Sequence, residues 1–552
     1  MNDFGSKIYA AAQKAVKEVY DLDVTEGQLV VETPQDTRLG DYSTSIAMKL
    51  SRTLRRNPME IAEPLAARLS ELLPECESVT VARPGFINFK LKASALTAVI
   101  NDVLAAGDDY GKNDSGKGKH LLLEWVSANP TGDLHCGHAR NAAWGDCIAR
   151  MMEASGWDVL REFYVNDAGN QIVMHGESLT ARYFEHFGKE YPLPEGGYHA
   201  DDIKVIAAQL AEEEGDKWLT ADPKERLAHF MDYGKKKELE KIDRDLKAYR
   251  VTMQSWMHET FFYENNSKRI NDCLQHMADM GLTYEKDGAL WFKSTDYGDD
   301  KDRVLRKSDG TLSYLTPDIA NHVYKIERGY PLLVNLWGAD HHSYVTRMQN
   351  ALTALGYPEG TLSVDLIQMV RMVEDGKEVK MSKRTGNAIT IRELCEDIGV
   401  DAARWFFVSK DVATHMDLDL KLARSKDNNN PVYYAQYAYS RMCSILKNPQ
   451  IPEFKPVDSY DRLTDEKELQ LLKMISEFPK EVAADALNRK PNKMTEYIIS
   501  LVKVFHSYYN STKVNNPDDP ELTNQRLGLI KATMITLKNA LQLIGVSAPE
   551  TM

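Results

Sequence analysis

The chain has 552 residues and carries 68 Lys and Arg against 82 Asp and Glu, which gives a net charge of −14 at pH 7. This length corresponds to roughly three or four domains. The acidic balance excludes a protein that is basic over its whole surface, but it leaves room for a local basic track. With 43% hydrophobic and 27% charged residues, the composition is that of a folded, soluble protein. No apolar run approaches the roughly 18 residues of a membrane span.

Cysteine usage and the N-terminus favour the cytoplasm. The six cysteines are scattered, without a CxxC pair or a histidine at ligand spacing, so we expect neither disulfides nor a metal site. The first 20 residues have the apolar spacing of an amphipathic helix. They lack the basic segment and the continuous apolar stretch of an export signal. We therefore expect a cytoplasmic protein and, since no heptad run stands out, a monomer.

The first region, residues 1–110, predicts a small α+β domain. A helical start is followed by an extended segment at 28–32 and a second helical stretch at about 43–73. Two strands, at 79–81 and 86–91, are predicted on either side of a Pro-Gly turn. The run from 107 to 119 is rich in glycine and polar residues and predicts a domain boundary.

Residues 111–400 change to an α/β pattern. A helix at about 137–155 lies between two predicted strands, which is the arrangement of a parallel sheet with a right-handed crossover. Strands are predicted at 120–126, 159–165, 332–337 and 366–373. The charge-rich stretch of about 175–285 predicts a helical insertion in this domain, and residues 401–552 predict an all-helical domain.

The motif His135-Cys136-Gly137-His138 follows the first of these strands, where the strand passes into the helix. Ligands of open α/β sheets bind at such strand ends, and a helix N-terminus offers free N–H groups to phosphate. Gly137 permits the close approach of a base or ribose, and the two histidines can donate hydrogen bonds to phosphate oxygens. The alternative is that the histidines bind a metal or belong to the core.

A second motif, Lys380-Met381-Ser382-Lys383-Arg384, follows a predicted hairpin with its turn at Asp375-Gly376. With Lys377, it gathers four cations in a short segment that a glycine follows. Such a loop can close over a triphosphate and stabilise the charge that develops during transfer. The alternative is a solvated basic loop.

An early HxGH motif and a late KMSK motif on one parallel α/β domain resemble the class I aminoacyl-tRNA synthetases. The surrounding sequence is similar to the bacterial arginyl-tRNA synthetases nearly end to end, most clearly at 124–138, 164–171, 314–318, 338–342 and 430–437. The resemblance implies a Rossmann-type catalytic domain with a helical insertion. It also implies a small α+β N-terminal domain that contacts the tRNA elbow and an all-α C-terminal domain that binds the anticodon.

The implied reaction is the activation of L-arginine with ATP and Mg²⁺, followed by transfer to the 3′-terminal adenosine of arginine tRNA. The resemblance makes His135, Gly137, His138, Lys380 and Lys383 catalytic. It assigns ATP to His135, His138, Gly338, Asp340, His341, Lys380, Ser382 and Lys383. It assigns arginine to Glu124, Asn129, Tyr314 and Asp318, and tRNA to Asn88, Tyr437 and Tyr509. The family's activation step waits for bound tRNA.

The arginine assignment agrees with charge logic. Glu124 lies in an apolar run, where an unpaired carboxylate is costly, and a guanidinium would supply its partner. The alternatives are that Glu124 pairs with an internal cation, that Tyr314 is core, and that Asp340 caps a helix. A further alternative is that the aromatic residues in the helices of 401–552 belong to the hydrophobic core. One family glutamine is replaced here, around Tyr344-Val345, so part of the amino-acid contact set differs.

Three rival functions stay open at this point. These rivals are a synthetase for another amino acid, a nucleotidyltransferase of the same superfamily and an inactive tRNA-binding paralogue. A nucleotidyltransferase would hardly need the large helical C-terminal domain, and the intact HxGH and KMSK motifs argue against the inactive paralogue.

Overall fold

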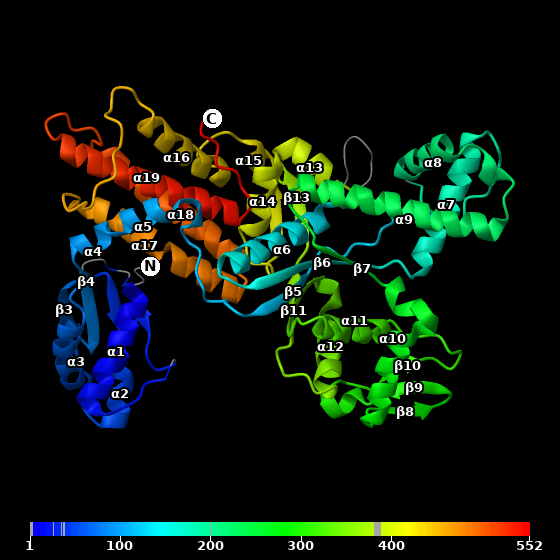
Figure 1. Ribbon diagram of the computed structural model, residues 1–552, viewed down its shortest axis with the longest axis horizontal. Helices are drawn as coiled ribbons and strands as arrows, with labels where there is room; N and C mark the ends of the chain where they lie inside the picture. The colour runs from blue at the N-terminus through cyan, green and yellow to red at the C-terminus, as the bar shows by residue number, and fades with distance from the viewer. Residues whose placement is uncertain (1–3, 26, 35, 37–38, 200, 380–387) are drawn as a thin grey trace.

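A computed structural model describes residues 4–25, 27–34, 36, 39–199, 201–379 and 388–552. Figure 1 shows an N-terminal unit in blue, an α/β centre and a helical C-terminal bundle in orange and red. Two further parts extend from the centre, one around α7–α9 and one around β8–β10. Within the described residues, no helix has the length and apolar character needed to cross a membrane.

The N-terminal unit is an antiparallel sheet with the strand order β1-β2-β4-β3, packed with three helices. Ile61, Leu65 and Leu69 recur along one face of α3 and are fully buried, as are the alternate residues Ile87 and Phe89 of β4. The elements are α1 (Phe4–Tyr20), β1 (Val31–Glu32), β2 (Tyr42–Thr44), α2 (Ile46–Leu54), α3 (Pro58–Leu72), β3 (Cys76–Ala82) and β4 (Phe86–Leu91). Of the extended segment expected at 28–32, only the last two residues form a strand.

The central sheet has five parallel strands in the order β12-β11-β5-β6-β7. The chain starts in the middle at β5 and builds outward on both sides, so the sheet has a switch point between β5 and β11, where ligands of such sheets bind. The strands are β5 (His120–Glu124), β6 (Asp158–Val165), β7 (Ser255–His258), β11 (Leu332–Gly338) and β12 (Leu362–Ile367). The parallel α/β fold expected from the sequence is confirmed.

Helix α6 (Cys136–Ala154) crosses from β5 to β6 and is buried along most of its length. Its small residues allow this close packing. At Gly145, an added Cβ would lie 2.4 Å from the ring of Trp125. The helix expected at 137–155 is therefore confirmed, and its N-terminus lies at the switch point.

The helical stretch after β6 falls into two parts, because β7 returns to the sheet within it. The first part is α7 (Asn170–His186), α8 (Asp201–Glu214) and α9 (Pro223–Ala248), with its own core around Leu179, Tyr183 and Phe230. The second part packs α10 (Thr260–Asp279), α11 (Leu315–Glu327) and α12 (His342–Ala354) with the sheet β10-β9-β8. Its strands are β8 (Thr283–Lys286), β9 (Ala289–Phe292) and β10 (Arg303–Arg306).

The C-terminal part is helical, as expected, apart from one strand. Its helices are α13 (Ile391–Ile398), α14 (Val400–Val408), α15 (Leu420–Arg424), α16 (Pro431–Leu446), α17 (Glu466–Asn488), α18 (Pro491–Ser511) and α19 (Pro520–Leu543). The link helices α4 (Ala93–Thr97) and α5 (Val99–Ala106) lie against this bundle (Figure 1). There Tyr110 donates a hydrogen bond to the carbonyl of Ile475 at 2.8 Å.

The single strand expected at 366–373 is wrong. β12 ends at Ile367, and a new strand, β13 (Val370–Glu374), belongs to a different sheet with β14 (Lys377–Glu378) and β15 (Met416–Asp419). The chain changes sheets at Gln368 and Met369, where the Gln368 amide bonds to the carbonyl of Val412. Apolar residues on both sides hide this change in the sequence. The expected hairpin turn is confirmed, since Asp375 and Gly376 both have positive φ between β13 and β14.

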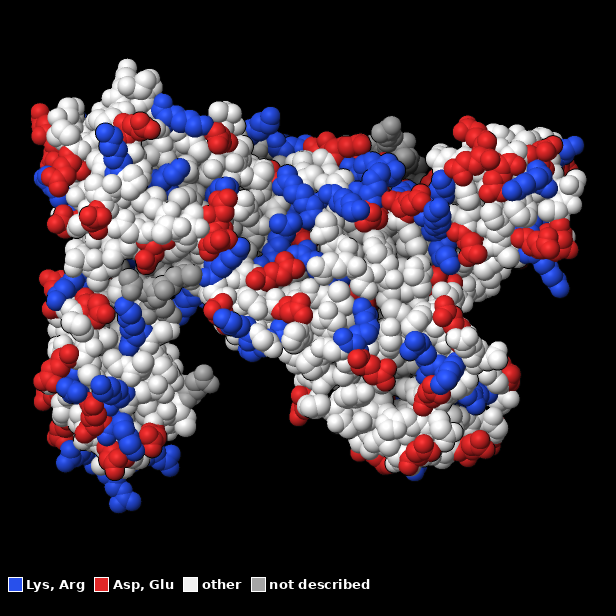
Figure 2. Space-filling view, viewed as in Figure 1, with Lys and Arg blue, Asp and Glu red and all other residues white. Residues whose placement is uncertain are grey.

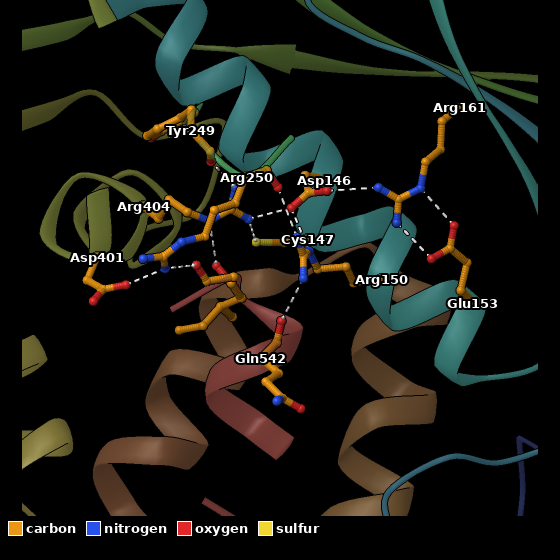
Figure 3. A network of polar contacts seen from close by, with 12 residues as sticks. Asp146, Cys147, Arg150, Glu153, Arg161, Tyr249, Arg250, Asp401, Arg404 and Gln542 are labelled. Atoms are coloured by element: carbon orange, nitrogen blue, oxygen red, sulfur yellow. Dashed lines mark hydrogen bonds and ion pairs between the residues drawn. The ribbon is translucent and has the colours of Figure 1, made fainter. Parts of the chain in front are cut away.

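One buried carboxylate joins the central α/β part to the C-terminal bundle. Figure 3 shows three arginines converging on Asp146 of α6: Arg404 from α14, Arg150 from the next turn and Arg161 from β6, at 2.6, 2.6 and 2.8 Å. Burial alone would raise the pKa of Asp146, but the arginines outweigh it, so the pKa lies below its usual value. Arg404 also donates to the carbonyl of Ile544, beyond α19.

Replacing Asp146 tests this junction. We expect Asp146→Asn to lower the free energy of unfolding by about 3–5 kcal/mol, because it leaves the fully buried Arg404 without a counter-charge. The urea midpoint and the thermal midpoint measure the loss. Asp108→Asn is the control, since Asp108 pairs with Lys538 at the surface and should leave both midpoints unchanged. Equal midpoints for both variants would show that Asp146 does not hold the domains together.

Candidate active site

The site lies at the carboxyl end of β5, at the switch point of the sheet. Directly after this strand, Val126 and Ser127 have positive φ, which is strained backbone for residues other than glycine. The bend is held by two bonds: the Val126 amide donates to Asn141 at 2.7 Å, and the Tyr164 amide donates to the hydroxyl of Ser127 at 3.1 Å. The chain then loops to the N-terminus of α6.

His135 and His138 cap that terminus reciprocally. Nδ1 of His135 accepts from the Gly137 amide at 3.1 Å, and Nδ1 of His138 accepts from the His135 amide at 3.2 Å. Because both Nδ1 atoms accept, each neutral ring carries its proton on Nε2 as a donor. The ring centroids lie 3.9 Å apart, and burial lowers the pKa of both imidazoles, that of His138 to about 3. Two neutral donors therefore stand beside a helix N-terminus, a suitable place for phosphate.

The chain after the second motif returns to the same terminus. The Cys136 amide donates to the carbonyl of Ile389 at 3.1 Å, and His135 forms an isolated β-bridge with Thr390. The predicted site residues Lys380, Ser382 and Lys383 lie outside the described residues.

Glu124, at the end of β5, is buried and already has a cationic partner. Its Oε2 accepts from Lys325 of α11, which is fully buried, and its Oε1 accepts from the Ser127 hydroxyl at 3.2 Å. The alternative in which Glu124 pairs with an internal cation is therefore what the structure shows. This pair could not be predicted from the sequence, because Lys325 is 201 residues away from Glu124.

Two other predicted arginine residues begin α11. Tyr314 is 90% exposed, so the alternative that it belongs to the core is wrong. Asp318 is one turn further and accepts from the hydroxyl of Tyr344 at 2.5 Å. Burial first, and then the charge of Glu124, raises the pKa of Asp318 to about 6. The fourth residue, Asn129, lies in the loop after β5. Its side-chain amide donates to the side-chain oxygen of Gln171 at 2.7 Å.

Glu259 is a site residue that sequence reasoning missed. It follows the carboxyl end of β7, and its amide donates to the carbonyl of Val165 at the end of β6. Burial, followed by the charges of Asp318 and Asp167, raises the pKa of Glu259 to about 7. The signal was β7 itself, four residues that the helical interpretation of 175–285 concealed.

Asp167 fixes the start of α10 next to Glu259. Its carboxylate accepts from the Thr260 amide at 2.9 Å and pairs with His258 and Lys235 at 2.8 and 3.2 Å. Asp167 is buried and its carboxylate is fully paired, so it stabilises the backbone on this side of the site.

Gly338 is the last residue of β11, and Asp340 and His341 follow it directly. A side chain at Gly338 would meet Oδ1 of Asp340 at 2.5 Å. The side chain of Asp340 is 81% exposed and lies 3.5 Å from Nε2 of His341. Helix α12 starts after His341 without a side-chain cap, so the alternative that Asp340 caps it is wrong. Both side chains are open to a ligand.

A second candidate site lies in the C-terminal bundle. Tyr437 of α16 and Tyr509 of α18 line a cavity of about 890 Å³, together with the C-terminal residues Thr551 and Met552. Arg441 lies between the two rings, 5.1 Å over that of Tyr509 and 3.5 Å from both hydroxyls. Other aromatic residues, such as Tyr439, Phe505 and Tyr508, are buried in the core. The structure thus separates the two tyrosines predicted for tRNA from the core set.

Asn88 does not fit its predicted role. It lies inside the N-terminal sheet, 5% exposed, and its side-chain oxygen accepts from Ser43 at 2.8 Å. Its partner Ser43, on the neighbouring strand β2, is also buried. Asn88 is therefore a buried structural residue with little surface for RNA.

Although the chain has a net negative charge, basic side chains gather in one area of its surface. Figure 2 shows Lys and Arg side chains gathered over the middle of this face, where α9 ends and α13 begins. Arg244 and Lys247 of α9 and Arg392 of α13 are exposed members of these segments. This is the kind of local basic track that a polyanion needs.

Among the described residues, no group of three or more His, Cys, Asp or Glu side chains could hold a metal ion.

Three family models match the chain: an arginyl tRNA synthetase N terminal domain at 6–91, a class I (R) tRNA synthetase catalytic domain at 99–419 and a DALR anticodon binding domain at 435–552. The arginine–tRNA ligases of Bacillus subtilis and Shouchella clausii are each 50% identical, over 95% of this chain and 94% of theirs. The arginyl-tRNA synthetase structure of Thermus thermophilus matches with a TM-score of 0.78 at 22% identity, over 99% of this chain and all of that one. The chain therefore belongs to the arginyl-tRNA synthetase family, the class I ligases that join arginine to tRNA.

Proposed function

We propose that the chain activates L-arginine at the carboxyl end of the central sheet and transfers it to a tRNA whose anticodon enters the C-terminal cavity. The observation that carries this proposal is a pair of carboxylates, Asp318 and Glu259, at one side of the site. Within the described parts of the chain, neither forms an ion pair with a cationic side chain. Burial raises the pKa of both carboxyls, and the charge of Asp318 raises the pKa of Glu259 further, so this side of the site favours a bound cation.

A guanidinium group fits this pair. It is planar and always charged, and it donates up to five hydrogen bonds in a fixed geometry. The exposed ring of Tyr314, at the start of the same helix as Asp318, offers it a face for stacking. Glu124 and Asn129 stay proposed arginine contacts, with Glu124 acting through Oε1 because Lys325 occupies Oε2.

In the first step, a carboxylate oxygen of arginine attacks the α-phosphorus of ATP, and the bond to the bridging oxygen of pyrophosphate breaks. His135 and His138 donate from Nε2 to phosphate oxygens, and the N-terminus of α6 adds its partial positive charge. Gly338, Asp340 and His341 are proposed to bind the ATP ribose. In the second step, the 2′-hydroxyl of the terminal adenosine attacks the carbonyl carbon, and AMP leaves. Positioning and charge stabilisation account for both steps.

Lys380, Ser382 and Lys383 are proposed to stabilise the leaving pyrophosphate. The support is the return of the chain to the helix terminus at Ile389 and Thr390. The described residues contain no acidic cluster suited to a resident metal ion, so Mg²⁺ is proposed to enter with ATP as the counter-ion of its phosphates.

The exchange of pyrophosphate into ATP, with each amino acid in turn and with or without arginine tRNA, tests the proposal. We expect exchange with arginine alone, and only when tRNA is present.

We expect Glu259→Gln to raise the KM for arginine about tenfold or more by removing a charged hydrogen-bond partner, with the KM for ATP little changed. Below about pH 7 the wild-type KM should also rise, because Glu259 and then, near pH 6, Asp318 bind protons in the free enzyme.

Glu285→Gln is the matched control, since Glu285 lies in β8 of the same part of the chain, outside the site. It should leave the KM for arginine unchanged. If Glu259→Gln behaves like Glu285→Gln, the acidic pair does not bind the substrate. Exchange with a different amino acid would keep the fold and refute the arginine pocket.

The anticodon cavity is tested by Arg441→Ala. Bases splayed from an anticodon loop stack on aromatic and guanidinium planes, so we expect the variant to bind arginine tRNA about tenfold more weakly or worse, measured by filter binding at one fixed salt concentration. Arg462→Ala is the control, because Arg462 belongs to the same domain but pairs with Asp519 and Glu521 away from the cavity. Equal affinities for the two variants would remove the cavity from the tRNA interface.

We also propose that the protein acts as a monomer in the cytoplasm. All six cysteines are free thiols, which is the usual state in a reducing compartment. Sedimentation equilibrium should return a mass near 62.5 kDa, and twice that mass would refute the monomer.

A further inference from the structure

Tyr344 stands where the family's glutamine was expected, and the structure gives its hydroxyl a specific partner. It lies in the first turn of α12 and donates to Oδ2 of Asp318 at 2.5 Å. Its ring also packs against Trp337, with centroids 5.7 Å apart. One side chain therefore contacts both the arginine side of the site, at α11, and the end of β11, which leads directly into the ribose segment 338–341.

The surroundings of Asp318 make this hydrogen bond important. Burial opposes the charge of the Asp318 carboxylate, and Glu124 adds repulsion. Lys325 attracts it but already pairs with Glu124. Among the interactions that lower the pKa of Asp318, and so favour its charged form, the hydrogen bond from Tyr344 is the largest. The charged or titratable groups around this pair are Glu124 of β5, Tyr164 of β6, Glu259 before α10, Tyr263 of α10, Lys325 of α11 and Arg347 of α12.

We propose that Tyr344 is a positioning residue for arginine, whose hydroxyl keeps the Asp318 carboxylate ionised and in the orientation that receives the guanidinium. This inference rests on the proposed arginine pocket and adds a residue that the resemblance did not assign. Because the ring of Tyr344 also packs against Trp337, which directly precedes Gly338, it also fixes the amino-acid side of the site relative to the nucleotide side.

A hydrogen bond to an ionised group is worth more than one between neutral groups. Without the hydroxyl, Asp318 keeps its burial and its repulsion by Glu124 but loses the donor that favours its charged form. Its pKa then rises above about 6, and a larger share of the enzyme near neutral pH carries a protonated Asp318. That form offers no negative charge to a guanidinium, so the effect must be larger at low pH and smaller at high pH.

The variant Tyr344→Phe removes only the hydroxyl and keeps the ring against Trp337. With saturating ATP and tRNA, we expect its KM for arginine to rise about tenfold near pH 6.5 and distinctly less near pH 8.5, while kcat and the KM for ATP change little. Tyr330→Phe removes a hydroxyl outside the pocket and controls for a general effect on folding; it should match the wild type at both pH values. A rise for Tyr344→Phe that is the same at both pH values, or no rise, would overturn the proposal.

A double-mutant cycle separates this inference from the function on which it rests. If Tyr344 acts through Asp318, Asp318→Asn should weaken arginine binding, and adding Tyr344→Phe to it should change the KM by less than about twofold. Full additivity of the two substitutions would show that Tyr344 acts independently and would refute the positioning role. If Asp318→Asn itself leaves the KM unchanged, the proposed arginine pocket fails, and this inference fails with it.

Discussion

The buried carboxylate of Asp146 is the point on which the arrangement of the enzyme depends. It lies in the middle of α6, the helix whose N-terminus carries both histidines, and it is bound by arginines from β6, from α14 and from the next turn of α6. Taking such groups out of water is costly, and only complete pairing compensates for it. The geometry that satisfies Asp146 is therefore also the geometry that places the catalytic helix against the C-terminal bundle.

A second anchor on the same helix acts nearer the substrates. Arg140 is fully buried and donates to the carbonyls of Gln368, Asp411 and Thr414 at 2.8, 2.9 and 3.0 Å. These carbonyls flank the small sheet that contains β13 and β15, from which the chain leads into the second motif. Since Asp146 and Arg140 lie on one helix, these contacts hold the helix N-terminus with its two histidines, the small sheet and the C-terminal bundle in one arrangement.

The sequence allowed the fold to be predicted where the signal is local. The alternation of strands, the start of α6 and the turn at Asp375-Gly376 depend on neighbouring residues, and all were found. The predictions failed where a distant contact decides. Gln368 and Met369 end one strand because another segment, at Val412, pairs there, and Asn88 is buried because β2 supplies Ser43. The partners of Glu124 and Asp318 come from helices that no spacing rule connects to β5. Glu259 was missed for the same reason, since β7 becomes a strand only by pairing with β6.

The charges around the proposed arginine pocket explain how it can be selective. Glu124 pairs with Lys325 inside the protein, whereas no cationic side chain among the described residues forms an ion pair with Asp318 or Glu259. A buried carboxylate without a cation is costly, so a neutral ligand of the same shape would enter at the expense of leaving two acidic groups unpaired. A guanidinium removes that cost, and its binding free energy includes the relief of the repulsion between Asp318 and Glu259. Selectivity then comes from the cost of leaving these carboxylates unpaired, and Tyr344 lowers that cost enough for Asp318 to stay charged until arginine arrives.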